Sequence, residues 1–168
     1  MQFEPALHIL ADRDLRVPRS DLHMTVQGDA VSVRAGLGRL MGSAPLMRLS
    51  ADCRGTVEIV MAEVLNNIVE HAYRAGPGPI RIAVQSNAAR LTVSVSDQGQ
   101  EMPQGEVPQG LLAPLGAQED LPEGGFGWHL IRELTDELLY ERRGLFNHLR
   151  FSISAEFEDE GPIVSHFE

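Results

Sequence analysis

The residues of this sequence best suited to chemistry gather in one stretch, from Thr56 to Tyr73. Its polar members recur three and four residues apart, which places them on one face of a helix: Glu63, Asn66, Asn67, Glu70 and His71. An amide oxygen and a carboxylate one turn apart are suitable ligands for a hard cation and a polarised water. The solvated face of an amphipathic helix explains the same spacing. The helix alone therefore leaves a site and an ordinary surface equally open.

Two glycine-containing motifs follow this stretch. Asp97-Gln98-Gly99 ends an alternating run, and Glu123-Gly124-Gly125-Phe126-Gly127 leads directly into a second helical pattern. Glycines at a helix start let backbone N–H groups approach phosphate oxygens, and the helix dipole favours negative charge there. The last motif therefore predicts a phosphate-binding turn.

In this order the three motifs resemble those of the GHKL (Bergerat-fold) ATPases, most closely the anti-sigma factor serine/threonine kinase branch of the RsbW type. The resemblance covers roughly residues 21–155. It implies ATP and Mg²⁺ as cofactors. It also implies a lid over the nucleotide at residues 100–123, where the chain has no periodicity and is rich in Pro, Gly and Gln.

The resemblance also implies roles for single residues. Glu63 would polarise the attacking hydroxyl or water, and the side-chain oxygen of Asn67 would hold Mg²⁺ against the triphosphate. Asp97 would accept a hydrogen bond from the adenine amino group, and Gly99 would leave room for the base. A surface Glu and an Asp that closes a strand are the plainer alternatives for Glu63 and Asp97.

The remaining expected site residues have weaker motifs. Gly125, Phe126 and Gly127 are expected at the phosphates, with the two glycines presenting N–H groups, unless they form a plain helix-starting loop. Asn66 is a nucleotide-binding candidate or a satisfied polar residue beside the site. His71 is a candidate phosphate contact or an ordinary helix-terminal His, which suits the helix dipole.

Two positions near the motifs bear on the resemblance. Asn147, after Gly144, resembles the last turn of the family and supports the fold more than the chemistry. Glu101 replaces the second glycine of the family's Asp-x-Gly-x-Gly. A Glu there is costly if the position needs a positive φ or a close approach to the nucleotide.

Periodicity predicts the elements that position these motifs. Alternation predicts strands at 22–27, 80–85, 91–96, 137–142 and 148–153. Helical stripes predict three helices: one capped by Asp29 and ended by Pro45 near Ala44, one from Ser50 or Asp52 to about Tyr73, and one with Trp128, Ile131 and Leu134 facing inward. We therefore expect a two-layer α/β (α+β) sandwich: a mixed, largely antiparallel sheet with helices on one face, which is also the Bergerat-type fold.

Composition limits the function classes. The chain has 168 residues, enough for one domain at 21–155 between an uncertain segment at 1–20 and a loose acidic tail at 156–168. All 14 basic residues are Arg, which excludes a P-loop, and the net charge of −10 argues against direct nucleic-acid binding. No apolar run is long enough for a membrane span, and the single Cys53 and the start of the chain give no sign of export, so we expect a cytoplasmic protein. The acidity fits a basic protein partner or simple solubility.

The function expected from the resemblance is an ATP-dependent serine/threonine protein kinase that also acts as an anti-sigma factor. It would phosphorylate a STAS-domain anti-anti-sigma protein, hold a sigma factor, and form a homodimer. Two alternatives remain at this stage: a nucleotide-binding module that only sequesters a partner, which Glu101 motivates, and a stand-alone GHKL ATPase.

Overall fold

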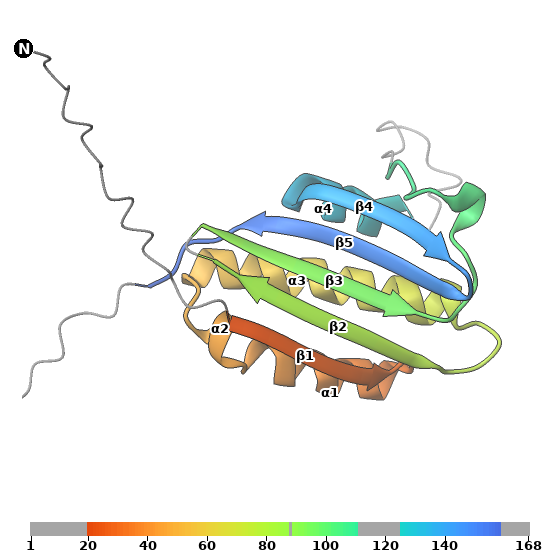
Figure 1. Cartoon of the computed structure of the whole chain (residues 1–168), viewed down its shortest axis with the longest axis horizontal. Helices are drawn as coiled ribbons and strands as arrows, with labels where there is room; N and C mark the ends of the chain where they lie inside the picture. Colours follow the sequence, from red (N-terminus) through yellow and green to blue (C-terminus); the bar gives the residue numbers. More distant parts are fainter. Residues whose placement is uncertain (1–19, 88, 111–124, 159–168) are drawn as a thin grey trace, which may run out of the picture.

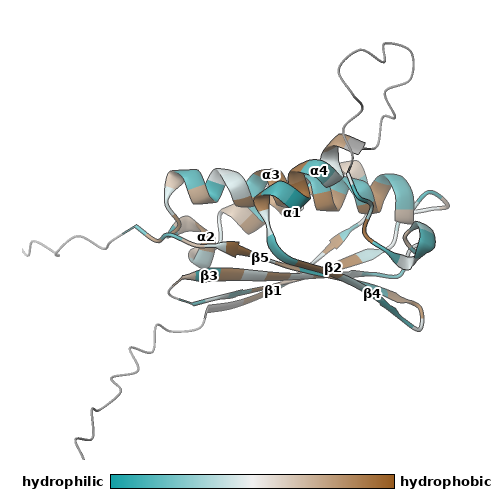
Figure 2. Cartoon of the chain, turned by 90° about the horizontal axis from the view of Figure 1, so that it is seen from above, coloured by the Kyte–Doolittle hydropathy of each residue, from teal (hydrophilic) through white to brown (hydrophobic). Residues whose placement is uncertain are grey.

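The structure, a computed structural model, describes residues 20–87, 89–110 and 125–158. Five strands form one sheet in the order β1-β2-β3-β5-β4, with every neighbouring pair antiparallel. All the α-helices lie on the same side of this sheet (Figures 1 and 2). The predicted two-layer sandwich is therefore confirmed, and its sheet is antiparallel throughout.

The elements follow one another along the described chain with short connections. They are β1 (Ser20–Gln27), α1 (Ala30–Met41), α2 (Ala44–Met47), α3 (Ala51–Asn67), the π-helix η1 (Ile68–Ala72), β2 (Pro79–Ser86), β3 (Arg90–Asp97), the 3₁₀ turn η2 (Pro103–Gly105), α4 (Gly125–Leu134), β4 (Asp136–Arg143) and β5 (Phe146–Ser154). The five predicted strands are confirmed within two residues at each end. The described residues contain no helix that is long and apolar enough to cross a membrane.

The strands alternate as their sequences predict. On β3, Leu91, Val93 and Val95 are buried against the helices, whereas the residues between them face the uncovered side of the sheet. Burying one face of each strand removes apolar area from water at about 25 cal/mol per Å². Because the side-chain period is two, a slip of one residue would expose that whole apolar set, so the alternation fixes the register.

The central helix α3 packs its apolar stripe against the sheet. Val57, Val60 and Met61 are fully buried, and the Ser50 side chain accepts a hydrogen bond from the Cys53 N–H at the helix start. Of the two predicted caps, Ser50 is therefore the one used. The α-helix ends at Asn67 instead of Tyr73, because the last turn widens into η1 and the Tyr73 N–H bonds the Ile68 carbonyl at 3.0 Å.

The first helix also differs from the prediction at its end. The Asp29 cap is confirmed, since its Oδ1 accepts from the N–H groups of Val31 and Ser32. The helix stops at Met41, and Pro45 lies in the first turn of the separate short helix α2. A proline has no N–H to lose in that first turn, so Pro45 starts a helix there and does not end one.

The Tyr73 side chain ties the end of the central helix to the sheet. Its hydroxyl donates to the Pro79 carbonyl at 2.8 Å and accepts from the Gln98 N–H at 3.1 Å. Its ring lies so close to Gly28 and Gly78 that a Cβ at either position would overlap it. The position of η1 beside the end of β3 therefore depends on this tyrosine.

Removing the Tyr73 hydroxyl should weaken the fold measurably. We expect Tyr73→Phe to lower the free energy of unfolding by about 1 kcal/mol, since two hydrogen bonds are lost near solvent. Tyr73→Leu, which also removes the ring, should cost about 2–3 kcal/mol. Urea unfolding of the three proteins measures both values, and a Tyr73→Phe variant as stable as the wild type would contradict the role given to the hydroxyl.

Candidate functional site

A cavity of about 360 Å³ opens between the C-terminal end of the central helix, α4 and the ends of the strands β3 and β5. Its lining includes Asn67, His71, Asp97, Trp128, Tyr140 and Asn147. The size is within the range of small-molecule sites in proteins. The cavity therefore brings the helix motif and the Asp97 motif together, as the sequence predicts.

Asp97 forms the base of this cavity and is only 5% exposed. Its Oδ1 accepts hydrogen bonds from the Gly99 N–H and from Asn147 Nδ2, both at 2.8 Å. Burial raises the pKa of the Asp97 carboxyl, and the two hydrogen bonds and the positive charge of Arg142 oppose that rise. The carboxyl group is thus held in a fixed orientation at a position where water is largely excluded.

Asn147 is the functional residue whose role the sequence analysis underestimated. It is 4% exposed, and its Nδ2 also donates to the Gln100 carbonyl at 3.0 Å. Its Oδ1 accepts from the Tyr140 hydroxyl at 2.8 Å and from Arg142 Nη1 at 2.6 Å. One signal could have revealed it: Asn147 is the polar residue among the core-facing positions of β5, and the register places it opposite Asp97.

Gly99 answers a requirement different from the one expected. A Cβ at this position would lie 2.5 Å from the Ala72 carbonyl oxygen and 2.6 Å from the Ala72 Cβ. The following Gln100 N–H donates to the same Ala72 oxygen at 2.8 Å. The glycine therefore lets the chain after β3 cross the end of η1, and it is not among the residues that line the cavity.

Glu63 and Asn67 meet the second glycine motif at one point. The Glu63 Oε2 occupies the space that a Cβ on Gly127 would need, and Asn67 Nδ2 lies 3.6 Å from the same position. Gly127 belongs to the first turn of α4, which packs against α3. The acid, the amide and the helix start are therefore neighbours in space, although more than 50 residues separate them in the sequence.

The Asn67 side chain has an unused hydrogen-bonding atom. Its Nδ2 is buried and makes no hydrogen bond with the described residues. An unpaired buried polar group costs about 1–3 kcal/mol, so such a group points to a ligand. Rotating the amide by half a turn would present the oxygen in its place.

The other expected site residues fall into three groups. Asn66 is exposed and outside the cavity lining, and Phe126 is 62% exposed, so neither closes the cavity in this structure. His71 lines the cavity mouth, where its Nδ1 lies 3.2 Å from Arg74 Nη2. Gly125 is the first residue of α4. The rest of the glycine motif and of the expected lid, residues 111–124, lies outside the described residues.

Glu101, which replaces a family glycine, fits without backbone strain. Its φ is not in the left-handed region, where only Gln104 and Glu137 are found among the described non-glycine residues. Its carboxylate lies 3.9 Å from Arg142 Nε at the cavity edge. The conformational cost considered from the sequence is therefore absent, and Arg142 offsets part of the negative charge.

The donor set suits a magnesium ion held mainly by a ligand's phosphates. Within the described ranges, no group of three His, Cys, Asp or Glu side chains is placed to hold a metal. Mg²⁺ commonly takes one or two protein oxygens and completes its shell with phosphates and water. The unpaired amide of Asn67 beside Glu63 fits that pattern.

Comparison with known proteins agrees with this geometry. Residues 28–153 match the family described as the histidine kinase-like ATPase domain. The serine/threonine-protein kinase BtrW of Bordetella bronchiseptica is 34% identical over 104 residues, which are 61% of this chain and 71% of that protein. The serine-protein kinase RsbW of Bacillus licheniformis is 30% identical over 135 residues, which are 77% of this chain and 83% of that protein.

A solved structure shares the fold. The RsbU and RsbW domains of Rv1364c from Mycobacterium tuberculosis match 82% of this chain with a TM-score of 0.52 and 16% sequence identity. The match covers 33% of that longer chain. At this identity the similarity supports the arrangement of helices and strands alone.

The buried Asp97 carboxyl should make stability depend on pH. Its pKa is raised on folding, so between the ordinary value of 3.8 and the folded value the native state holds a proton that the unfolded state has lost. The contribution of Asp97 to stability therefore falls as the pH rises through that window. We expect the free energy of unfolding of Asp97→Asn, relative to the wild type, to increase from pH 4 to pH 7 in urea titrations. A difference that is constant or shrinks over this range would contradict the assignment.

Proposed function

The chain belongs to the histidine kinase-like ATPase family, and we infer that it binds ATP and transfers the γ-phosphoryl group to a serine or threonine hydroxyl of a partner protein. The family membership confirms the resemblance found from the motifs. The observation that carries the inference is the meeting of Glu63, Asn67 and Gly127 above a cavity whose base is Asp97.

The Asp97 end of the cavity is suited to adenine. A buried carboxylate oxygen fixed by Asn147 and the Gly99 N–H can accept a hydrogen bond from an exocyclic amino group. A base with a carbonyl at that position would set oxygen against oxygen and leave the buried carboxylate unsatisfied. Such unpaired buried groups give strong discrimination between ligands.

The Gly127 end is suited to phosphates. The α4 helix begins at Gly125, so its first N–H groups have no partner within the helix and its dipole favours an anion. Mg²⁺ bound at the Asn67 oxygen would neutralise charge on the phosphate oxygens. The polyphosphate would therefore run from the Asp97 end toward the start of α4.

Glu63 is placed to orient the hydroxyl that reacts. The acceptor oxygen forms a bond to the γ-phosphorus while the bond from that phosphorus to the bridging oxygen of ADP breaks. The Glu63 carboxylate would accept the hydrogen bond of the attacking hydroxyl and take its proton. Catalysis of this kind depends mainly on position and charge.

The proposed partners follow from the anti-sigma branch of the family. We propose a STAS-domain anti-anti-sigma protein as the phosphoryl acceptor, a sigma factor as the protein that this chain holds, and a homodimer as the working form. The relatives RsbW and BtrW are named as protein kinases that act on serine, or on serine and threonine. We propose the cytoplasm as the compartment, where ATP and such partners are available.

Substituting Glu63 should separate binding from transfer. We expect Glu63→Gln to lower the rate of phosphoryl transfer by about 10²–10⁴-fold, the usual contribution of a general base. ATP affinity should change by no more than about threefold, because the amide keeps the shape of the side chain. Transfer of labelled phosphate from ATP to a STAS-domain protein and calorimetry with ATP measure the two effects. Transfer at the wild-type rate would contradict the role of Glu63.

Substituting Asn67 should act on binding itself. We expect Asn67→Ala to weaken Mg²⁺-dependent ATP binding by about tenfold or more, since a charge-bearing contact is removed from a buried position. Asn66→Ala is the matched control: the same amide is removed from the adjacent exposed position, and affinity should stay within about twofold. Equal losses in the two variants, or no nucleotide binding by the wild type, would contradict the proposed site.

A further inference from the structure

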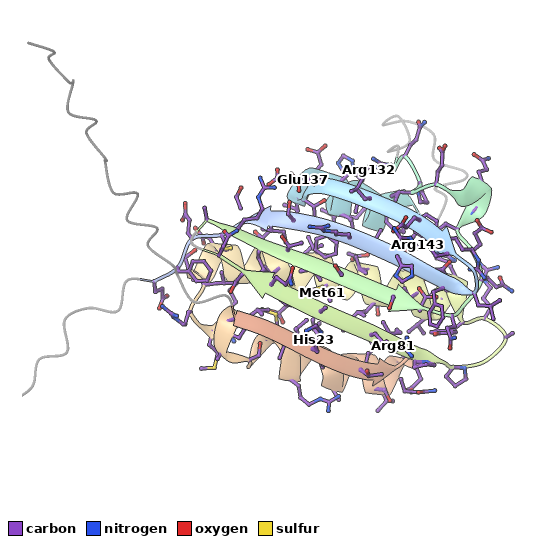
Figure 3. The ribbon with its side chains drawn as sticks, viewed as in Figure 1. His23, Met61, Arg81, Arg132, Glu137 and Arg143 are labelled. Carbon is purple, nitrogen blue, oxygen red and sulfur yellow. The ribbon has the colours of Figure 1, made fainter. Side chains whose placement is uncertain are left out.

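The face of the sheet opposite the helices carries a second hollow, which the nucleotide site does not use. Its volume is about 580 Å³. Figure 2 shows that no helix covers this side, and Figure 3 looks onto it, with His23 on β1 and Arg81 on β2. The side chains that carry its chemistry are His23, Arg81, Ser94, Ser96, His148 and Arg150. We call this surface the open face.

The strand register arranges these side chains in two rows. The first row crosses the sheet through Thr25, Arg81, Ser96, His148 and Glu141. The second crosses it through His23, Ala83, Ser94, Arg150 and Leu139. Residues directly opposite each other on antiparallel strands point to the same side. The small residues lie in the middle of both rows, so the hollow has a low floor with longer cationic side chains around it.

Two of the arginines on this face have no carboxylate partner. Glu137 is paired with Arg90 at 2.7 Å, and Glu141 is paired with Arg143 at 2.8 Å. Within the described part of the chain, neither Arg81 nor Arg150 makes an ion pair. The Arg81 guanidinium lies over the Phe146 ring, 5.4 Å from its centroid. The open face is thus a cationic region on a chain whose net charge is −10.

The spacing of these two arginines suits an extended peptide. Arg81 on β2 and Arg150 on β5 are separated by β3 and by one row. Strands about 4.8 Å apart and a two-residue step of about 7 Å place the two Cα atoms on the order of 12 Å apart. In an extended chain, side chains four residues apart are separated by about 13 Å and point to the same side.

An exposed apolar residue adjoins the cationic pair. Leu139 is 62% exposed and lies directly opposite Arg150 in the pairing of β4 with β5. Arginine and aromatic side chains on a surface are typical of protein-binding sites, and carboxylates are the preferred partners of guanidinium groups. The open face therefore offers two anion contacts and one apolar contact in a fixed arrangement.

We propose that the open face binds an acidic, extended segment of a partner protein, with carboxylates at Arg81 and Arg150 and an apolar side chain at Leu139. A second copy of this chain fits less well, because a twofold axis would bring four unpaired guanidinium groups into one interface. The inference does not depend on ATP binding, since the two sites lie on opposite sides of the sheet.

The test uses the full chain and a synthetic peptide of about nine residues, long enough to cross both rows. The peptide carries Asp at every fourth position, one Leu, and Ser or Gly elsewhere; a matched peptide has Asn for each Asp. We expect saturable binding of the Asp peptide by fluorescence polarisation and no binding of the Asn peptide. Amide shifts in the ¹⁵N spectrum should be concentrated on the outward-facing residues of β2, β3 and β5.

Two double variants with equal charge change decide the outcome. Arg81→Ala with Arg150→Ala should weaken binding of the Asp peptide by about tenfold or more. Arg34→Ala with Arg39→Ala, at exposed positions of α1, should leave it within about twofold. Circular dichroism and ATP titration check that both variants fold and bind nucleotide like the wild type.

Three results would overturn the proposal. One is the absence of saturable binding of the Asp peptide by the wild type. Another is an equal loss in both double variants, which would mean attraction to net charge alone. The third is sedimentation showing that the wild type self-associates and that the variant lacking Arg81 and Arg150 does not, since a second copy would then occupy the face.

Discussion

The buried Asp97 carboxyl is the constraint on which the arrangement of this site depends. A carboxyl group removed from water must find hydrogen-bond donors or stay protonated, and Asn147 and the Gly99 N–H are the donors here. Asn147 can donate in this direction because Tyr140 and Arg142 both donate to its oxygen and so fix its amide. A binding group at the end of β3 therefore requires support from β4 and β5.

The same network holds the segment that follows β3. The Tyr140 hydroxyl accepts from the Met102 N–H at 3.2 Å, and Arg142 Nη1 donates to the Gly99 carbonyl at 3.2 Å. Gln100 is fixed from the other side by the Ala72 carbonyl. The chain leaving Asp97 is thus held between the last hairpin and the end of η1, which keeps the cavity open without a ligand.

The sequence predicted the parts of this molecule that depend on local chemistry. Alternation found all five strands, and the spacing of Glu63 and Asn67 placed both on one helix face, next to Gly127 in the structure. The sequence missed what depends on register and packing. The role of Asn147 follows from its pairing opposite Asp97, and the close approach at Gly99 follows from the widened turn of η1. Neither the hairpin register nor the π-turn has a marker in local composition.

The alternation of β-strands also explains how one small sheet can serve two surfaces. Asp97 and Asn147 face the helices, whereas their neighbours Ser96 and His148 face the open side and are paired with each other. The nucleotide cavity and the open face therefore share the ends of β3 and β5. A change of side-chain rotamer on one face leaves the backbone hydrogen bonds in place, and the other face is unaffected. A shift of either strand along its axis would displace both sets of side chains together, because the register of that one pair positions them all.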